Sequence, residues 1–278
     1  MLKRVLRGSI TRAKDWLFDG GQPLLADPRY AESLALYHRL TPELYQHCYA
    51  WGVVRGIVTA KALEMPRVSL VEFGVAGGNG LVAIERMAVR LEEYCGIGID
   101  VHGFDMSTGL PAPTSKYDLP YMYSPGQFTM DVEALKQRLQ KAKLHLGLVQ
   151  DTVKGFIEDE PSPIAFVSFD MDYYSSTMAA FQVFEASPSI LMPRVHCFFD
   201  DVMDCGDFEG ERRAILEFNQ RHDSRKLSKM HGLRYIAPKR NVNVANYWDK
   251  YYMAAIFDHP LFDKYEGHTH LCLELSGS

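Results

Sequence analysis

The chain has 278 residues, of which 47% are hydrophobic and 23% charged. This composition provides enough apolar surface for a folded core and excludes disordered and collagen-like proteins. The 30 basic and 35 acidic residues give a formal net charge of -5, so the basic excess typical of nucleic-acid-binding proteins is missing and no nucleic-acid partner is expected. No apolar stretch reaches the roughly 18 residues that a membrane span requires, so we expect no stable membrane insertion.

Neither the cysteines nor the first residues indicate secretion. The 5 cysteines are scattered without CxxC spacing, which predicts neither a disulfide framework nor a zinc site and favours a cytoplasmic location. Residues 1–18 interleave basic and apolar side chains, whereas a signal peptide needs an uninterrupted apolar run. We expect a packing or lid helix here, with a helix lying on a membrane surface as the alternative.

Two helical patterns precede the first strand pattern. Residues 31–39 and 42–63 carry apolar side chains at helical spacing. Thr41 stands as an N-cap before Pro42, a residue that suits the first position of a helix. These segments predict an N-terminal helical cover over residues 1–66, ahead of a core formed by residues 67–278.

From residue 68 onward, short apolar segments alternate with helical ones. Strands are predicted at residues 68–75, 98–105, 144–150, 164–170 and 195–200, and helices at residues 81–93, 131–142, 175–185 and 209–221. Strands that are almost continuously apolar and separated by helices indicate a parallel sheet covered on both faces. The predicted fold class is therefore α/β, a doubly wound, mostly parallel sheet. Further strands at residues 232–237, 251–257 and 270–275 are expected at the sheet edge, in an order left open.

Acidic residues stand at the ends of all five predicted central strands. They are Glu72, Asp105, Asp151, Asp170 with Asp172, and Asp200 with Asp201. Open parallel sheets bind ligands in the crevice beyond the carboxyl ends of their strands, so these acids are expected to share one cleft.

A glycine-rich turn follows the first predicted strand. The sequence EFGVAGGNG at residues 72–80 leads from strand to helix, and such a turn lets a ligand approach the backbone and offers free N–H groups. The dinucleotide spacing GxGxxG fails at Ala76 and Ala83, and no P-loop lysine follows. Asp105, at the end of the second strand, can accept hydrogen bonds from both hydroxyls of a ribose, so a nucleoside-containing cofactor is predicted. A turn or cap acid is the alternative.

The acid pairs at the fourth and fifth strands predict a metal site. Carboxylates brought together at neighbouring strand ends raise each other's pKa unless a cation neutralises them. Oxygen ligands favour Mg²⁺, with Mn²⁺ and Ca²⁺ as alternatives. Solvated loop acids are the competing interpretation.

Four sequence blocks resemble those of a known family. They are EFGVAGGNG at 72–80, HGFDMSTGLP at 102–111, FDMDYYSST at 169–177 and FFDDV at 198–202. Together they are similar to the class I S-adenosylmethionine-dependent methyltransferases, of Rossmann-like fold, and among these to the macrocin O-methyltransferase type. The resemblance implies an S-adenosyl-L-methionine- and Mg²⁺-dependent O-methyltransferase whose acceptor is a sugar, a glycosylated natural product or another small molecule with a vicinal diol.

The resemblance also assigns roles to residues. The implied cofactor-binding residues are Glu72, Phe73, Gly74, Gly77, Asp105, Met106, Gln150 and Asp151, with Asp105 at the ribose and the last two near the adenine. Asp170, Asp200 and Asp201 would bind the metal, and Asp172 would be the general base. Two alternatives stay open: an oxidoreductase with a nucleotide cofactor, and an inactive nucleoside-binding module. Besides its small-molecule acceptor, the sequence allows a second copy of the chain as a partner in a homo-oligomer.

Overall fold

The computed structural model describes residues 28–40, 48–233 and 247–264. The basic segment at residues 1–18, the Thr41 cap with Pro42, the predicted strand at 270–275 and most of that at 232–237 lie outside the described residues. None of the described helices combines the length and apolarity needed to cross a membrane.

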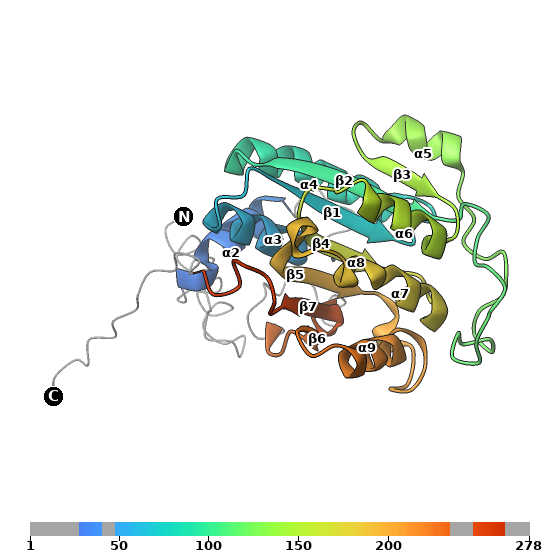
Figure 1. The fold of residues 1–278 in the computed structure, drawn as a ribbon. Helices are drawn as coiled ribbons and strands as arrows, with labels where there is room; N and C mark the ends of the chain where they lie inside the picture. The colour runs from blue at the N-terminus through green and yellow to red at the C-terminus, as the bar shows by residue number, and fades with distance from the viewer. Residues whose placement is uncertain (1–27, 41–47, 234–246, 265–278) are drawn as a thin grey trace, which may run out of the picture.

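The described part of the chain is built on a seven-stranded sheet, in the order β3-β2-β1-β4-β5-β7-β6 (Figure 1). Its strands are β1 (Arg67–Phe73), β2 (Gly98–Asp105), β3 (Lys143–Leu146), β4 (Ile164–Phe169), β5 (Leu191–Phe199), β6 (Arg225–Lys229) and β7 (Tyr251–Ile256). The first five are parallel, whereas β7 runs antiparallel between β5 and β6. The expected doubly wound, mostly parallel α/β fold is thereby confirmed.

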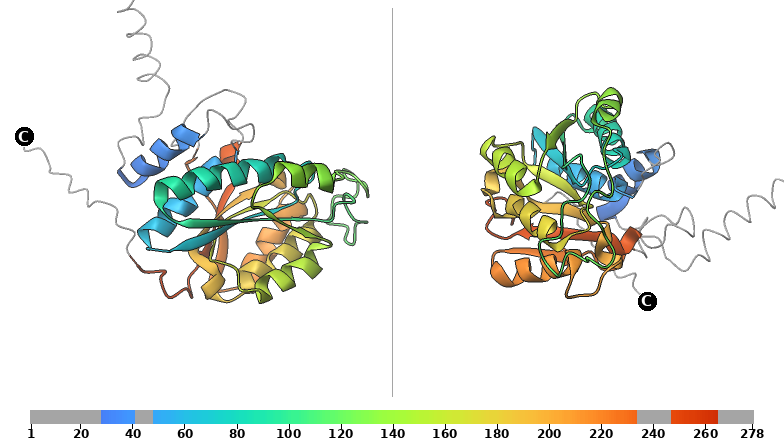
Figure 2. Two further views of the ribbon diagram at one scale, coloured as in Figure 1. Left: turned by 90° about the horizontal axis from the view of Figure 1, so that it is seen from above. Right: turned by 90° about the vertical axis from the view of Figure 1, so that its right-hand side faces the viewer.

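Helices cover both faces of this sheet (Figures 1 and 2). On one face lie α3 (Ala50–Ala62) and α4 (Asn79–Cys95), with α2 (Pro28–Leu40) packed outside α3. The other face carries α6 (Val149–Glu158), α7 (Tyr174–Ala180), α8 (Gln182–Glu185) and α9 (Gly210–Arg221). Because both faces are covered, every residue of β4 is buried, which explains its uninterrupted apolar sequence.

Helix α3 packs tightly against the sheet through two glycines. A Cβ atom added at Gly56 would be 2.7 Å from the backbone oxygen of Ala165, and one at Gly52 would be 2.5 Å from the ring of Phe166. Since only glycine leaves this space empty, the two glycines, one turn apart, let the helix rest on β4. This packing brings Tyr49, at the start of α3, to the carboxyl ends of the central strands.

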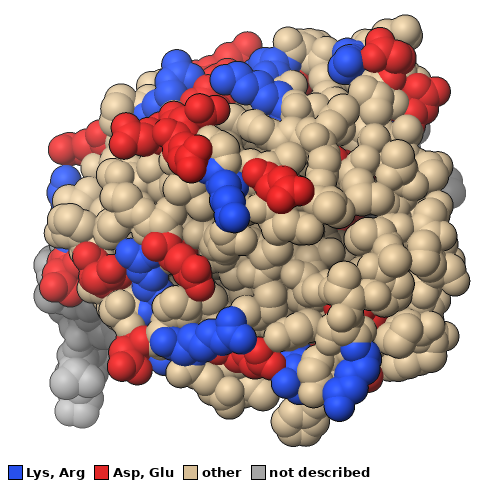
Figure 3. Space-filling model, turned by 45° about the vertical axis from the view of Figure 1, so that its right-hand side comes forward, with Lys and Arg blue, Asp and Glu red and all other residues tan. Residues whose placement is uncertain are grey.

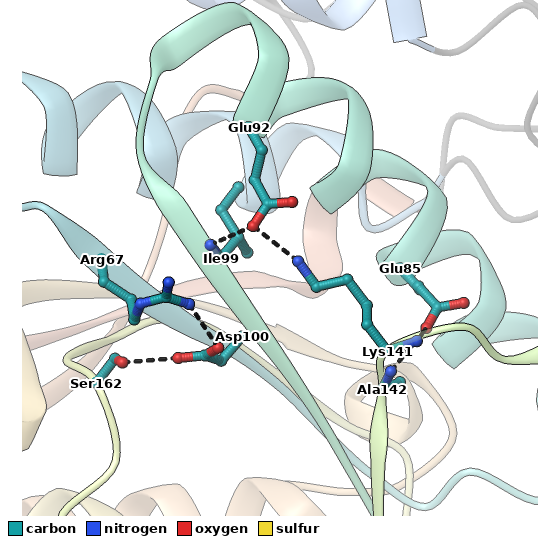
Figure 4. A network of polar contacts seen from close by, with 8 residues as sticks. All are labelled: Arg67, Glu85, Glu92, Ile99, Asp100, Lys141, Ala142 and Ser162. Carbon is teal, nitrogen blue, oxygen red and sulfur yellow. Dashed lines mark hydrogen bonds and ion pairs between the residues drawn. The ribbon is translucent and has the colours of Figure 1, made fainter.

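Two carboxylates of α4, the buried Glu85 and the half-buried Glu92, fix the edge of the sheet (Figure 4). Glu85 accepts hydrogen bonds from the backbone N–H groups of Gln140, Lys141 and Ala142, just before β3. Glu92 accepts hydrogen bonds from the N–H of Ile99 and from the Lys141 ammonium. These contacts join the helix to β2 and β3, so the short edge strand is held by polar bonds as well as by packing.

Several predicted boundaries are wrong. The strand expected at residues 144–150 ends at Leu146, because the chain turns at Gly147 with φ of +139° and begins α6 at Val149. The helix expected at residues 131–142 is α5 (Val132–Arg138), which stops before β3, and the helix expected at 175–185 is divided at Phe181. The helix expected at residues 42–63 is described only from Ala50, as α3.

Candidate functional site

The acids at the ends of β1, β4 and β5 lie in a row. Their order follows from the parallel ladder, which continues one residue past the strands: the N–H of Asp170 donates to the oxygen of Phe73, and the N–H of Asp200 donates to that of Phe169, both at 2.9 Å. Adjacent strand ends therefore place residues that are distant in sequence beside one another, as predicted.

A cavity of about 310 Å³ opens at these strand ends. Among the predicted cofactor-binding residues, those that line it are Glu72, Gly74, Gly77, Asp105, Met106 and Gln150, and the acids Asp170 and Asp172 line it as well. Phe73 and Asp151 do not. Phe73 is fully buried between the rings of Phe104 and Phe169, and Asp151 is exposed in the first turn of α6.

The glycine-rich turn is shaped by close contact between strands. Gly74 has a φ of +87°, and a Cβ atom there would lie 1.7 Å from the backbone oxygen of Asp170. Gly77 faces open space within the cavity wall. Helix α4 starts directly afterwards, and its cap residue Gly78 offers no side-chain hydrogen bond to the helix start. The cavity is therefore bordered by backbone and a helix N-terminus, as a phosphate- or carboxylate-bearing ligand would need.

Asp105 holds this turn in place. Its Oδ2 accepts hydrogen bonds from the N–H groups of Val75 and Ala76, at 2.9 and 2.8 Å, and its Oδ1 accepts one from Ser107. Asp105 therefore stabilises the turn with its side chain, which is the alternative to ribose binding that the sequence left open. Oδ2 uses both of its lone pairs in this way, whereas Oδ1 keeps a second one, so a hydrogen bond from a ribose hydroxyl to Oδ1 remains compatible with this role.

Asp170, Asp200 and Asp201 form an acid cluster. One carboxylate oxygen from each lies within 4.8 Å of the others, a span that a single cation coordinated at about 2.1–2.6 Å can bridge. Burial, followed by the charges of Asp200 and Asp201, raises the pKa of Asp170 well above its usual value. Burial and the charges of Asp172 and Asp200 raise the pKa of Asp201 to about 8. An oxygen-binding divalent cation fits this donor set, because it would relieve the repulsion.

Asp172 lines the cavity next to the acid cluster. Its φ of +61° is strained for a residue with a side chain, and its backbone N–H donates to Oδ2 of Asp201 at 3.0 Å. The side chain is largely buried, and burial raises its pKa to about 6, although a hydrogen bond with Tyr123 acts in the opposite direction. A carboxylate so placed can accept a proton from a ligand in the cavity near neutral pH.

Four further residues of the site follow from no sequence pattern. Tyr49 lines the cavity and hydrogen-bonds Glu72, whose pKa burial raises to about 8 and whose Oε2 has no partner among the described residues. Tyr123 forms the hydrogen bond with the side chain of Asp172. The Lys250 ammonium lies 2.9 Å from Oδ1 of Asp200.

The fourth residue, Glu211, supports the cluster from α9. It is fully buried, and its Oε2 accepts a hydrogen bond from the backbone N–H of Asp201 at 2.9 Å. Its only signal in the sequence is an acid in the first turn of the helix that follows the FFDDV block, and many helices have such an acid without a function.

The surface beside the acid cluster is rich in exposed apolar side chains. They come from two segments and are Tyr121, Met122 and Phe128, and Met203 and Phe208. Phe128 also lines the cavity. Figure 3, which brings the right-hand side of Figure 1 forward, shows a broad uncharged field, with basic and acidic side chains intermixed around it.

Neither comparison of the sequence identifies a family for this chain. No protein-family model matches the sequence, and no curated protein is significantly similar to it.

The chain resembles several solved structures, among them a calicheamicin methyltransferase and two O-methyltransferases. The calicheamicin methyltransferase CalS11 is 23% identical over 69% of this chain and 85% of its own, with a TM-score of 0.47. The O-methyltransferase NovP is 18% identical over 63% of this chain and 72% of its own, with a TM-score of 0.49. An O-methyltransferase from Bacillus cereus, solved in complex with SAH, is 12% identical over 89% and 97%, with a TM-score of 0.41. At these identities the likeness concerns the fold.

Proposed function

We propose that this protein is an S-adenosyl-L-methionine-dependent O-methyltransferase that uses a divalent cation, Mg²⁺ above all. The observation that carries the proposal is the position of the acid cluster: Asp170 belongs both to the cluster and to the wall of the cavity behind the glycine-rich turn. A methyl donor and a cation-bound acceptor would thus meet at one strand end.

The cavity wall supplies groups for each part of the methyl donor. The buried Glu72 has a carboxylate oxygen without a partner, which suits the amino group of the methionine part. Gly77 leaves room for the ligand against the turn, and Asp105 and Gln150 border the region for the ribose and adenine. The positive sulfonium is favoured by the surrounding carboxylates.

Asp170, Asp200 and Asp201 would hold the cation. When bound there, the ion would lower the pKa of an acceptor hydroxyl and orient it. Asp172 would accept the proton of that hydroxyl, because its carboxylate lines the cavity and is fixed by the bond from its own N–H to Asp201. The methyl donor, when bound, would supply the methyl group, and the residues of the cavity wall would hold it beside the hydroxyl that Asp172 deprotonates.

The acceptor class follows from the surface around the cluster. Two adjacent hydroxyls suit chelation, and the exposed apolar side chains, with Phe128 at the cavity wall, suit an acceptor that also has an apolar part. A sugar on a glycosylated natural product meets both conditions. The protein would therefore act on small molecules in an aqueous compartment such as the cytoplasm.

Calorimetry and methyl transfer test the proposal against its two alternatives. S-adenosylhomocysteine is expected to bind and NAD is not, whereas an oxidoreductase would show the reverse. With a panel of glycosides and catechols as acceptors, Asp172→Asn is expected to reduce methyl transfer at least about a hundredfold while S-adenosylhomocysteine affinity stays within about threefold. An inactive binding module would bind S-adenosylhomocysteine, yet transfer no methyl group to any acceptor with or without Mg²⁺.

A further inference from the structure

The positively charged side chain of Lys250 forms an ion pair with the acid cluster. Lys250 ends the 3-10 helix η6 (Tyr247–Lys250), and the next residue, Tyr251, begins β7 and pairs with Phe198 of β5. This register puts Lys250 beside the end of β5. Its ammonium contacts Oδ1 of Asp200 at 2.9 Å, and its side chain is only 13% exposed.

The lysine contacts one of the two oxygens of a cluster carboxylate. Asp200 is therefore shared between a resident ammonium and any cation that the cluster binds. A divalent cation and an ammonium that share one carboxylate repel each other, and this repulsion is weakly screened because Lys250 is shielded from water.

The position of Asp200 does not depend on the lysine alone. Its N–H bonds to the oxygen of Phe169, and the following residue, Asp201, is held by Glu211 and by the N–H of Asp172. Loss of an outer hydrogen bond to a metal ligand usually weakens metal binding. Here the backbone and the neighbouring residues preserve the orientation, so the effect of charge dominates.

We propose that Lys250 is a built-in counter-ion of the Asp170–Asp200–Asp201 cluster, which stabilises the three carboxylates when no metal is bound and weakens their affinity for a divalent cation. This inference rests on the cation site of the proposed function. Through its charge beside Asp200, Lys250 sets how tightly the resting protein holds its ion.

The test is titration of the full-length protein with Mg²⁺ alone, by isothermal calorimetry at about pH 9, where protons compete least with the ion for the carboxylates. Lys250→Met and Lys250→Gln are expected to bind Mg²⁺ at least about tenfold more tightly than the wild type. Lys250→Arg, which keeps the charge, is expected to bind as the wild type does.

A matched control is Lys229→Met. Lys229 is another lysine with an ion pair, 3.0 Å from Asp249, on β6. Its removal is expected to leave Mg²⁺ affinity unchanged. Thermal unfolding of every variant without metal checks the fold, and Lys250→Met is expected to unfold at a lower temperature than Lys250→Arg.

Two results would overturn the inference in different ways. If Lys250→Met and Lys250→Gln bind Mg²⁺ as tightly as the wild type or more weakly, Lys250 is not a competing counter-ion, yet the cation site stands. If neither the wild type nor any Lys250 variant binds Mg²⁺, the cation site of the proposed function fails too, and S-adenosylhomocysteine binding then shows whether its cofactor part survives.

Discussion

At the scale of single residues, the site depends on hydrogen bonds that reach the acids through the backbone. Glu211 holds the N–H of Asp201, and Asp201 in turn holds the N–H of Asp172, which keeps the left-handed conformation of Asp172 in place. This chain of contacts joins α9 to the cavity wall through the two acids that the proposed function needs most. A strained backbone conformation of this kind is kept only where the surrounding contacts hold it in place.

Glu211 gives a test of this chain. Glu211→Gln keeps a carbonyl oxygen that can accept the Asp201 N–H, whereas Glu211→Ala leaves that buried donor unpaired. We expect Glu211→Ala to lower the free energy of unfolding by about 1–3 kcal/mol more than Glu211→Gln does, measured by urea denaturation. Equal stability of the two variants would show that the hydrogen bond to Asp201 contributes nothing.

At the scale of elements, the glycine-rich turn combines two kinds of glycine. Gly74 has a positive φ and touches the backbone of Asp170, whereas Gly77 has neither constraint and borders the cavity. The first is thus needed for the backbone to pack against Asp170, and the second leaves space in the cavity that the proposed cofactor would fill. The sequence places both glycines in one glycine-rich motif and does not distinguish their roles.

Substitution separates these two roles. Gly74→Ala is expected to lower the free energy of unfolding by about 2 kcal/mol or more, because a Cβ atom cannot fit against Asp170. Gly77→Leu is expected to change that free energy by less than about 1 kcal/mol, while S-adenosylhomocysteine affinity falls at least about tenfold as the side chain fills the cavity. The opposite pattern, a stable Gly74→Ala or full affinity in Gly77→Leu, would reject this division.

The sequence predicted the buried central strands well but missed the edge strand β6 and helix α6, for physical reasons. The central strands β1, β2, β4 and β5 are buried on both faces, so their apolar runs stand out. The edge strand β6, with sequence RKLSK, has too few apolar residues to be recognised. Helix α6 was missed because the apolar residues before it read as part of a longer strand.

The sequence predicted which residues lie together wherever the strand order alone brings them together. Parallel strands bring their ends together, so the neighbourhood of Asp170, Asp200 and Asp201 followed from the fold class alone. Tyr49, Glu211 and Lys250 come from helices and loops whose packing no local pattern encodes. Phe73 was assigned to the cofactor from its motif, but alternation along β1 turns its side chain into the core.

At the scale of the whole molecule, buried histidines link stability to pH. His102 and His196 are buried in β2 and β5, and burial lowers their pKa to about 4 and about 3. An unfolded chain protonates histidine at a pKa of about 6.5, so it binds more protons than the folded protein below that pH. The stability that both residues contribute is present above about pH 6.5 and is lost as the pH falls toward 4.

Replacement of one histidine measures this effect. His102→Phe keeps a ring beside Phe156, 4.8 Å away in the native protein, and removes the proton-binding group. Between pH 6.5 and 4, the free energy of unfolding of this variant is expected to fall less steeply than that of the wild type, by up to about 1.4 kcal/mol per pH unit. An unchanged slope in His102→Phe would refute the linkage.

The central claim is that one strand end holds both a methyl donor and a divalent cation. A crystal structure of the protein with S-adenosylhomocysteine and Mn²⁺, with data recorded at the manganese absorption edge, tests it most directly. We predict an anomalous peak bridged by Asp170, Asp200 and Asp201, with the cofactor in the cavity beside Gly77. S-adenosylhomocysteine bound elsewhere, or a cavity filled by cofactor with no anomalous peak among the three aspartates, would contradict the account.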